Sequence, residues 1–218
     1  MNRLRHFPTV VLVVRQRRAT TVSVGASAHA STSRARNAKS RVTWARFVNR
    51  NNSELANNFG NLAQRSLAMI AKNFGGGMPP RQDGSGEDNK IIAETIVSIS
   101  RMEEAMVTEQ LHEATAELIA ALSAANLYFA DQAPWGKKDD LARMGAILAT
   151  TADVVRRCAI AAQPFVPTAA AKFLDLLAVP GDQRLLQHAL DPDLMVAAGT
   201  PLPPPEPVFK KFEQTKST

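Results

Sequence analysis

Cysteine is almost absent from this sequence, which has only Cys158 among its 218 residues. One thiol cannot form an internal disulfide, and no Cys-x-x-Cys pair is available to bind zinc or to carry out redox chemistry. The four histidines are scattered along the chain, and we interpret each as an ordinary side chain. The sequence therefore predicts no metal site and no catalytic residue, and it favours a reducing, cytoplasmic environment.

Long apolar runs are also lacking. The strongest run near the start, Val10 to Val14, is five residues long and is followed at once by Arg15, Arg17 and Arg18. A membrane-spanning helix needs about 20 consecutive apolar residues. This stretch is therefore too short for a membrane span, and it makes no convincing secretory signal. We expect no membrane partner.

Acidic residues are absent from the first quarter of the chain. Residues 1–53 carry eleven of the 26 Lys and Arg and none of the 20 Asp and Glu, so they have a charge of +11 while residues 54–218 have −5. A pI near 9.8 would ordinarily suggest a nucleic-acid binder. Here the basic charge lies in a tail, so a folded part that binds RNA must do so through local chemistry.

Residues 1–41 form this basic tail, and no apolar period in them could line a core, which predicts disorder. Three origins are consistent with the composition. A mitochondrial transit peptide would place the protein in the mitochondrial matrix. A reading-frame or start-site error, which we favour, would make the tail foreign to the domain. A true RNA-binding arm is the third.

The rest of the chain shows helical periodicity, and no segment has sustained alternation with turn signals. Residues 42–180 are predicted to form an all-α, antiparallel bundle of four to five helices. Residues 181–218 are predicted to form a C-terminal helix or turn and an extended Pro-rich arm, with Phe209 and Phe212 as apolar contacts. The expected buried stripes are Leu55, Phe59, Leu62, Ser66, Met69 and Ile70; Ile92, Ile96, Ile99, Met102 and Met106; Leu111, Leu118, Leu122, Ala125 and Phe129; and Leu141, Met144, Leu148, Thr151, Val155 and Cys158, with a short fifth helix over residues 168–177.

A polar stripe on the first helix is the most informative feature. Asn57, Asn61 and Arg65 have i, i+4, i+8 spacing, which places them on one face, away from the buried stripe. Asparagine is a weak helix former, yet residues 49–61 contain six. An ordinary solvated face is one interpretation. The other is base recognition, because carboxamides match the edge of a base and Arg supplies a cation.

A second feature is the segment YFADQAPW, residues 128–135, in which the third helix must end before Pro134. The turn that follows presents the indole of Trp135. A tryptophan at this position is often a hydrophobic plug. On a rigid turn it can instead offer its face to an unstacked base.

Two segments, Phe47 to Arg65 (FVNRNNSELANNFGNLAQR) and Asp131 to Trp135 (DQAPW), resemble in order and separation the helical anticodon-binding domain of bacterial and organellar methionyl-tRNA synthetases. The resemblance extends through QPFVP at 163–167, FLDLLAVP at 173–180 and the Pro-rich segment 201–209. It implies that Asn57, Asn61 and Arg65 face the anticodon loop of the methionine tRNA. It also implies that Trp135 stacks on the first anticodon base, a cytosine.

The sequence departs from the family at Asn51, where an aromatic is usual, and at Asn58, where Asp is usual. No segment resembles the HIGH-like or KMSKS-like signatures that hold ATP. In this family the catalytic domain that binds ATP and methionine precedes the helix starting near Val42, which is why we favour an error in the tail. We therefore expect no cofactor in this chain and no synthetase activity from it alone.

The resemblance implies a fragment of a methionine–tRNA ligase that recognises a tRNA anticodon. We expect a monomer, with a separate catalytic domain as its partner. The alternative is a free-standing helical adaptor, derived from a synthetase, that uses the same surface to bind protein.

Overall fold

The computed structural model describes residues 44–81 and 85–213, which belong to one compact unit starting at Val42. Within these ranges the chain is helical and has no strand, apart from a single bridge between Gly77 and Pro201. The predicted all-α class is therefore confirmed. The prediction of a disordered tail over residues 1–41 lies outside the described residues.

The predicted long first helix consists of three consecutive elements: α2 (Trp44–Arg50), the π-helix η1 (Asn51–Gly60) and α3 (Asn61–Asn73). The backbone stays helical at both junctions, and the helix stops where Gly75 and Gly76 adopt positive φ. Because i→i+5 turns hold more residues than α turns, the 3.6-residue period fails in η1. Phe59 is buried as predicted, but Ala56 is buried in place of Leu55, which was expected in the core and is only half-buried.

The remainder of the expected first stripe is only partly right. Leu62, Ser66 and Ile70 are buried as predicted, but Met69 is half-buried. Helix α3 packs against α6, and its buried face is wider than one stripe because it also includes Ala63 and Leu67.

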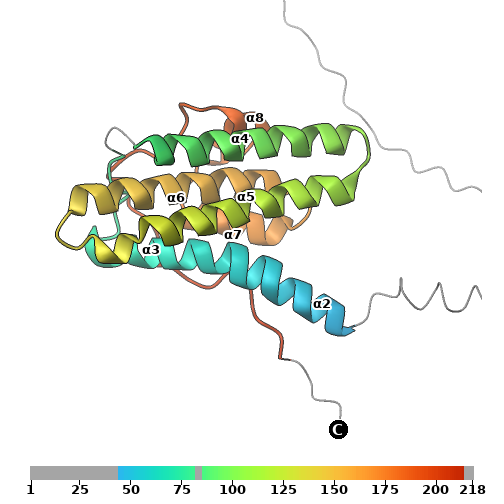
Figure 1. Ribbon diagram of the computed structural model, residues 1–218, viewed down its shortest axis with the longest axis horizontal. Coiled ribbons are helices and arrows are strands. Elements are labelled where there is room, and N and C mark those ends of the chain that lie inside the picture. The colour runs from blue at the N-terminus through green and yellow to red at the C-terminus, as the bar shows by residue number, and fades with distance from the viewer. Residues whose placement is uncertain (1–43, 82–84, 214–218) are drawn as a thin grey trace, which may run out of the picture. The chain divides into compact units, whose positions relative to one another are not determined.

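Helices α4 (Gly86–Val107) and α5 (Leu111–Gln132) form an antiparallel hairpin, seen in green and lime in Figure 1. Ser85 and Asp88 make a capping box at the start of α4. The expected stripes are buried along most of both helices, but Ile96 and Met106 are half-buried and Leu111 is exposed. Leu111 begins α5 at the end of the hairpin, where no neighbouring helix covers it. Helix α5 ends at Gln132 because Ala133 takes a left-handed conformation before Pro134.

Helix α6 (Leu141–Ala162) is the centre of the bundle and contacts α3, α4, α5, α7 and α8 (Figure 1). Asp140 caps it, accepting a hydrogen bond of 2.9 Å from the backbone N–H of Arg143. Every residue from Met144 to Ala162 is buried, which is the pattern of a helix covered on all sides. The predicted stripe from Met144 to Cys158 is thus buried, while Leu141, before the covered part, is exposed.

The C-terminal part covers the bundle with α7 (Pro167–Leu176), the 3-10 turn η3 (Gly181–Gln183), α8 (Leu186–Leu190) and a non-helical arm. Phe209 of the arm lies 5.6 Å from Phe173 and 6.3 Å from Phe59, measured between ring centroids. Further along, Phe212 contacts the rings of Trp44 and Phe47. Both arm phenylalanines therefore pack on the bundle, as the sequence suggested.

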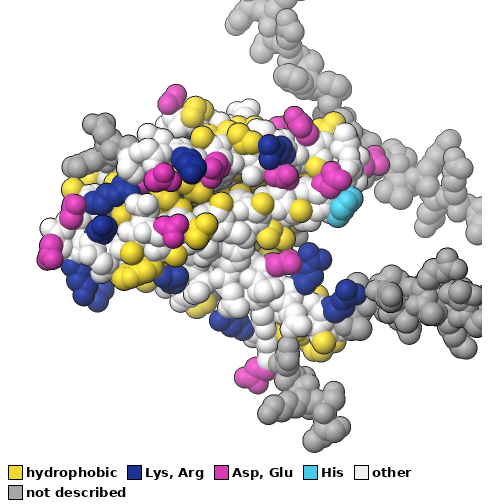
Figure 2. Space-filling view, in the orientation of Figure 1, with side chains coloured by type: hydrophobic (Ala, Val, Ile, Leu, Met, Phe, Trp, Pro, Cys, Tyr) yellow, Lys and Arg dark blue, Asp and Glu magenta, His cyan; other side chains and the backbone are white. Residues whose placement is uncertain are grey.

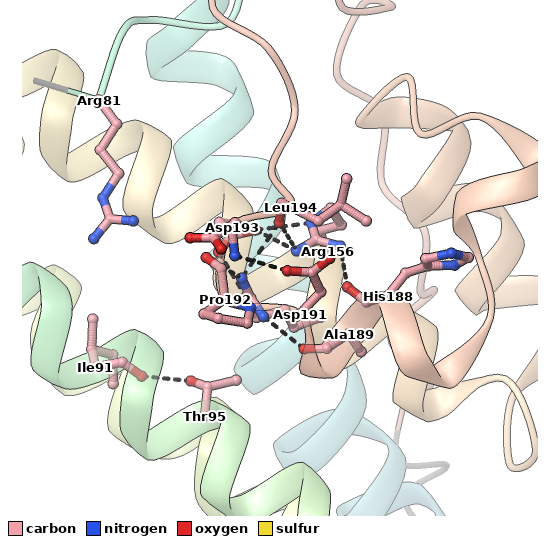
Figure 3. Close-up of polar contacts among 12 residues, drawn as sticks. Arg81, Ile91, Thr95, Arg156, His188, Ala189, Asp191, Pro192, Asp193 and Leu194 are labelled. Atoms are coloured by element: carbon pink, nitrogen blue, oxygen red, sulfur yellow. Dashed lines mark hydrogen bonds and ion pairs between the residues drawn. The ribbon is translucent and has the colours of Figure 1, made fainter.

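A charged cluster lies inside this core. Asp153, Arg156 and Arg157 of α6 are each at most 3% exposed. The Asp153 carboxylate accepts hydrogen bonds of 2.8 Å from the Nε of each arginine. The remaining guanidinium N–H groups donate to backbone carbonyls of residues 188–194, which Figure 3 shows gathered around the cluster. The cluster thereby holds α8 and the start of the arm against α6.

Candidate functional site

Arg65 and Trp135, which are 70 residues apart in sequence, come together at one end of the bundle. Arg65 lies in the first turns of α3, and Trp135 lies in the 3-10 turn η2 (Pro134–Gly136) between α5 and α6. The guanidinium carbon of Arg65 is 5.3 Å from the centroid of the Trp135 ring and 5.0 Å from that of Phe129. At these distances the cation is attracted to both aromatic faces.

Trp135 is supported on one side and open on the other. Its ring meets that of Phe129 edge to face, with centroids 5.8 Å apart, and Phe129 itself is fully buried. The Trp135 side chain nevertheless remains 45% exposed. A hydrophobic plug would be covered, so the geometry fits an indole presented on a supporting surface.

Asn61 lies one turn before Arg65 on α3, and both side chains are exposed. Asn57 is exposed one turn earlier, in η1. Within the described ranges, no side-chain hydrogen bond occupies either carboxamide. Arg65 and Trp135 therefore share one end of the bundle, and Asn61 and Asn57 lie one and two turns before Arg65 on the same helix.

Three other asparagines of this helix, Asn51, Asn52 and Asn58, have structural roles that the sequence did not indicate. Asn51 donates to the backbone carbonyl of Lys210, and Asn52 exchanges hydrogen bonds with the backbone of Phe212 at 2.8 and 3.0 Å. The richness in asparagine thus partly reflects docking of the C-terminal arm. Asn51, one of the two departures from the family pattern, belongs to this contact.

Asn58, the second departure, connects η1 to α5. Its side-chain oxygen accepts a 2.6 Å hydrogen bond from Asn126, and its side-chain nitrogen donates to Ser123 over 3.1 Å. This contact fixes the π-helical segment against the helix that ends at the Trp135 turn.

A buried polar network lies behind the Trp135 turn, and no sequence signal indicated it. Asp88 is fully buried at the start of α4. Its carboxylate accepts a 2.6 Å hydrogen bond from the Tyr128 hydroxyl and forms a bidentate ion pair with the Arg143 guanidinium. Arg143 also donates over 2.6 Å to Gln132, the last residue of α5. The network therefore joins the start of α4, the end of α5 and the start of α6.

Opposing effects set the pKa of Asp88. Burial would raise it, but the hydrogen bonds from Arg143, Tyr128 and Ser85 outweigh burial and lower the pKa from its ordinary 3.8 to about 2. The ionised carboxylate is therefore more favourable in the folded chain than in the unfolded one.

Acid is expected to weaken the bundle through this carboxylate. A carboxyl whose pKa is lower in the folded chain than in the unfolded chain stabilises the fold. This stabilisation is complete at pH values above the pKa in the unfolded chain, and it is lost as the pH falls toward the pKa in the folded chain. We expect Asp88 to contribute about 2 kcal/mol at pH 7, of which about 1 kcal/mol is lost by pH 3. Urea unfolding at both pH values measures this loss. The Asp88→Asn variant is the control and should lose about 1 kcal/mol less over the same range; an equal loss would contradict the assignment.

We next consider metal ligands, the cysteine thiol, membrane-spanning helices and surface charge in the described part of the chain. It has no cluster of three or more His, Cys, Asp and Glu side chains placed to hold a metal. Burial raises the pKa of Cys158 to about 12, so its thiol stays protonated. None of the helices in these ranges is long and apolar enough to span a membrane. Basic and acidic side chains are interspersed on the face shown in Figure 2, so an RNA contact on that face would depend on local groups.

Known proteins place this chain in context. A family model, the anticodon binding domain of methionyl tRNA ligase, matches residues 78–218. These residues include Trp135 but not the polar stripe of Asn57, Asn61 and Arg65. A methionine–tRNA ligase of Mesorhizobium japonicum is 47% identical over 167 residues, covering 76% of this chain and 32% of that protein. A methionine–tRNA ligase of Mycobacterium leprae is 36% identical over 175 residues, covering 78% of this chain and 32% of that protein.

A solved structure shows the same arrangement. The apo form of Mycobacterium tuberculosis methionyl-tRNA synthetase superposes with a TM-score of 0.75 at 34% identity, covering 79% of this chain and 35% of that one. The chain thus spans about a third of the length of the relatives that it matches.

Proposed function

Because this chain belongs to the methionyl-tRNA ligase family and carries its anticodon-binding domain, we propose that it selects the methionine tRNA by its anticodon loop. Trp135 stacks on the first anticodon base, a cytosine. Asn57 and Asn61 read base edges with their carboxamides, and Arg65 contacts a base or phosphate.

The observation that carries this proposal is the half-exposed indole of Trp135 held beside Arg65 and Phe129. Stacking an unpaired base on an aromatic ring is worth about 1–3 kcal/mol. The adjacent guanidinium offers a cation and planar N–H donors at the same place. The free carboxamide of Asn61, one turn away, can both donate to and accept from a base edge. These groups supply stacking, charge and base discrimination within one surface.

The chemistry of aminoacylation belongs to a catalytic domain that binds ATP and methionine, and we propose that this bundle acts together with such a domain, on the same or a separate chain. One anticodon surface gives only part of the tRNA interface. Joining it to a second contact raises the apparent affinity through effective concentration. The isolated chain, which we propose to be a monomer, is therefore expected to bind tRNA more weakly than a complete ligase.

Base selection tests the function directly. The 218-residue chain is titrated with an anticodon stem-loop carrying CAU and with one in which only the first base is changed, at one low salt concentration, since affinity depends on salt. We expect a preference for CAU of about 5- to 150-fold, because a lost base contact costs about 1–3 kcal/mol. Equal affinity for the two loops would contradict anticodon recognition. Absence of binding to both would favour a protein-binding adaptor.

A further inference from the structure

The turn that carries Trp135 is bracketed by Arg143. This turn runs from Ala133 to Asp140, between the last residue of α5 and the first of α6. The Arg143 side chain donates to Gln132 before the turn, and its backbone N–H donates to Asp140 at the end of the turn. The Arg143 side chain therefore ties the start of the segment that presents the indole, while its backbone N–H completes the cap at the other end.

The position of Arg143 is itself fixed from a third helix. Its guanidinium makes a bidentate pair with the carboxylate of Asp88 in α4, and Tyr128 donates to the same carboxylate. A bidentate guanidinium–carboxylate pair restrains orientation as well as distance. The hydrogen bonds inside the turn, such as Gly136 N–H to the Ala133 carbonyl at 2.9 Å, are local and do not tie it to α4.

We propose that Arg143, held by Asp88, is a positioning residue for anticodon recognition: it sets the orientation of Trp135 without touching the RNA. This inference rests on the proposed function of Trp135. A rigid platform needs less ordering when the base stacks, and such pre-organisation strengthens binding. Loosening the turn should therefore weaken binding through the indole alone.

A double-mutant cycle tests this coupling. Affinity for the CAU stem-loop is measured for the full chain, Arg143→Leu, Trp135→Ala and the double variant. We expect Arg143→Leu to weaken binding about 5- to 10-fold in the parent and less than about twofold once Trp135 is gone, because coupled residues are non-additive. The same loss in both backgrounds would overturn the proposal, since it would mean that Arg143 acts independently of the indole.

Arg184→Leu is the matched control. The Arg184 side chain is 23% exposed against 22% for Arg143. Like Arg143 it makes an ion pair and donates to one further group, which in its case is the backbone carbonyl of Val179. It lies beyond the other end of α6, where Gln163 donates to its carbonyl, about 30 Å away along a 22-residue helix. We expect its stem-loop affinity to change by less than about twofold. A loss equal to that of Arg143→Leu would overturn the proposal by showing that removing an arginine far from the turn has the same effect on binding.

Fluorescence provides a readout that is independent of RNA. The chain has two tryptophans, so Trp44→Phe leaves Trp135 as the only indole. Adding Arg143→Leu should increase quenching of Trp135 by acrylamide and lower its anisotropy in the folded chain. Unchanged values would overturn the positioning role. If the parent fails to bind the stem-loop, the proposed function fails, while this measurement still decides whether Arg143 orders the indole.

Arg143→Leu leaves the Asp88 carboxylate unpaired, so a second variant guards against unfolding. Gln132→Leu removes the bond between Arg143 and α5 but keeps the ion pair. We expect the same changes in quenching and affinity, at about half the size. Wild-type behaviour of Gln132→Leu would contradict the proposed link between the network and the turn.

Discussion

Replacing Asp153 with asparagine is expected to lower the free energy of unfolding by about 3–5 kcal/mol. The carboxylate is the counter-charge of two buried guanidinium groups, those of Arg156 and Arg157. Burial already lowers the pKa of Arg156, which reflects the cost of keeping its charge in the core. Without Asp153 the two charges would be balanced by backbone carbonyl dipoles and, for Arg156, by the weaker attraction of Asp191.

Urea unfolding of the full chain measures this loss, and Asp175→Asn is the control. Asp175 also pairs with an arginine, but its side chain is 66% exposed, so its removal should change stability by less than about 1 kcal/mol. Similar losses for the two variants would contradict the importance of burial. We expect far-UV circular dichroism of surviving folded Asp153→Asn to remain helical, with the segment at 188–194 more sensitive to protease.

The buried charges show where sequence reasoning reaches its limit. Asp153, Arg156 and Arg157 have the i, i+3, i+4 spacing of ordinary ion pairs on an exposed helix face. Periodicity correctly predicted a helix here, with Met144 through Cys158 on its buried stripe. It could not predict that the opposite face would be covered by α8 and the arm, because that depends on tertiary packing.

The first helix shows a different limit. Its existence, and its end at the glycines following residue 74, follow from composition and spacing. The π-helical turns of η1 cannot be predicted in this way, because placing residues on the faces of a helix assumes a fixed number of residues per turn. As a consequence the assumed period places Leu55 in the core. The abundance of asparagine, which was counted in favour of base recognition, includes Asn52 and Asn58, and these two bind other parts of the protein.

Residue spacing and family resemblance contributed differently to the prediction of the candidate site. Spacing alone placed Asn61 and Arg65 on one face but could not join them to Trp135, because contacts across 70 residues leave no local pattern. Resemblance to the synthetase family made that connection, and the structure brings Arg65 against Trp135. The network of Asp88, Arg143 and Gln132 was missed, since its members are ordinary helix residues by type and spacing.

Trp135→Ala is expected to weaken binding of the CAU stem-loop by about 5- to 150-fold, which corresponds to the 1–3 kcal/mol of one stacked base. The helical content should hardly change, because the indole is 45% exposed and lies outside the main core. Arg65 would also lose one of its two aromatic neighbours. Part of the loss therefore reflects a less ordered cation beside the missing ring.

The chain supplies its own control for this experiment. Trp44, the only other tryptophan, is 61% exposed at the start of α2. It lies 21 residues before Arg65 on the same continuous helix, so about 30 Å separates the two. Trp44→Ala removes an equally large exposed ring and should leave stem-loop affinity within about twofold.

The dissociation constants of Trp135→Ala and Trp44→Ala for the CAU stem-loop, measured side by side with the parent, test the proposed anticodon surface most directly. We predict a loss confined to Trp135→Ala, with both variants folded as judged by circular dichroism. Equal affinities of the two variants and the parent would contradict the stacking role. Unfolding of Trp135→Ala, with unchanged affinity of its remaining folded fraction, would likewise show that the indole is a structural plug.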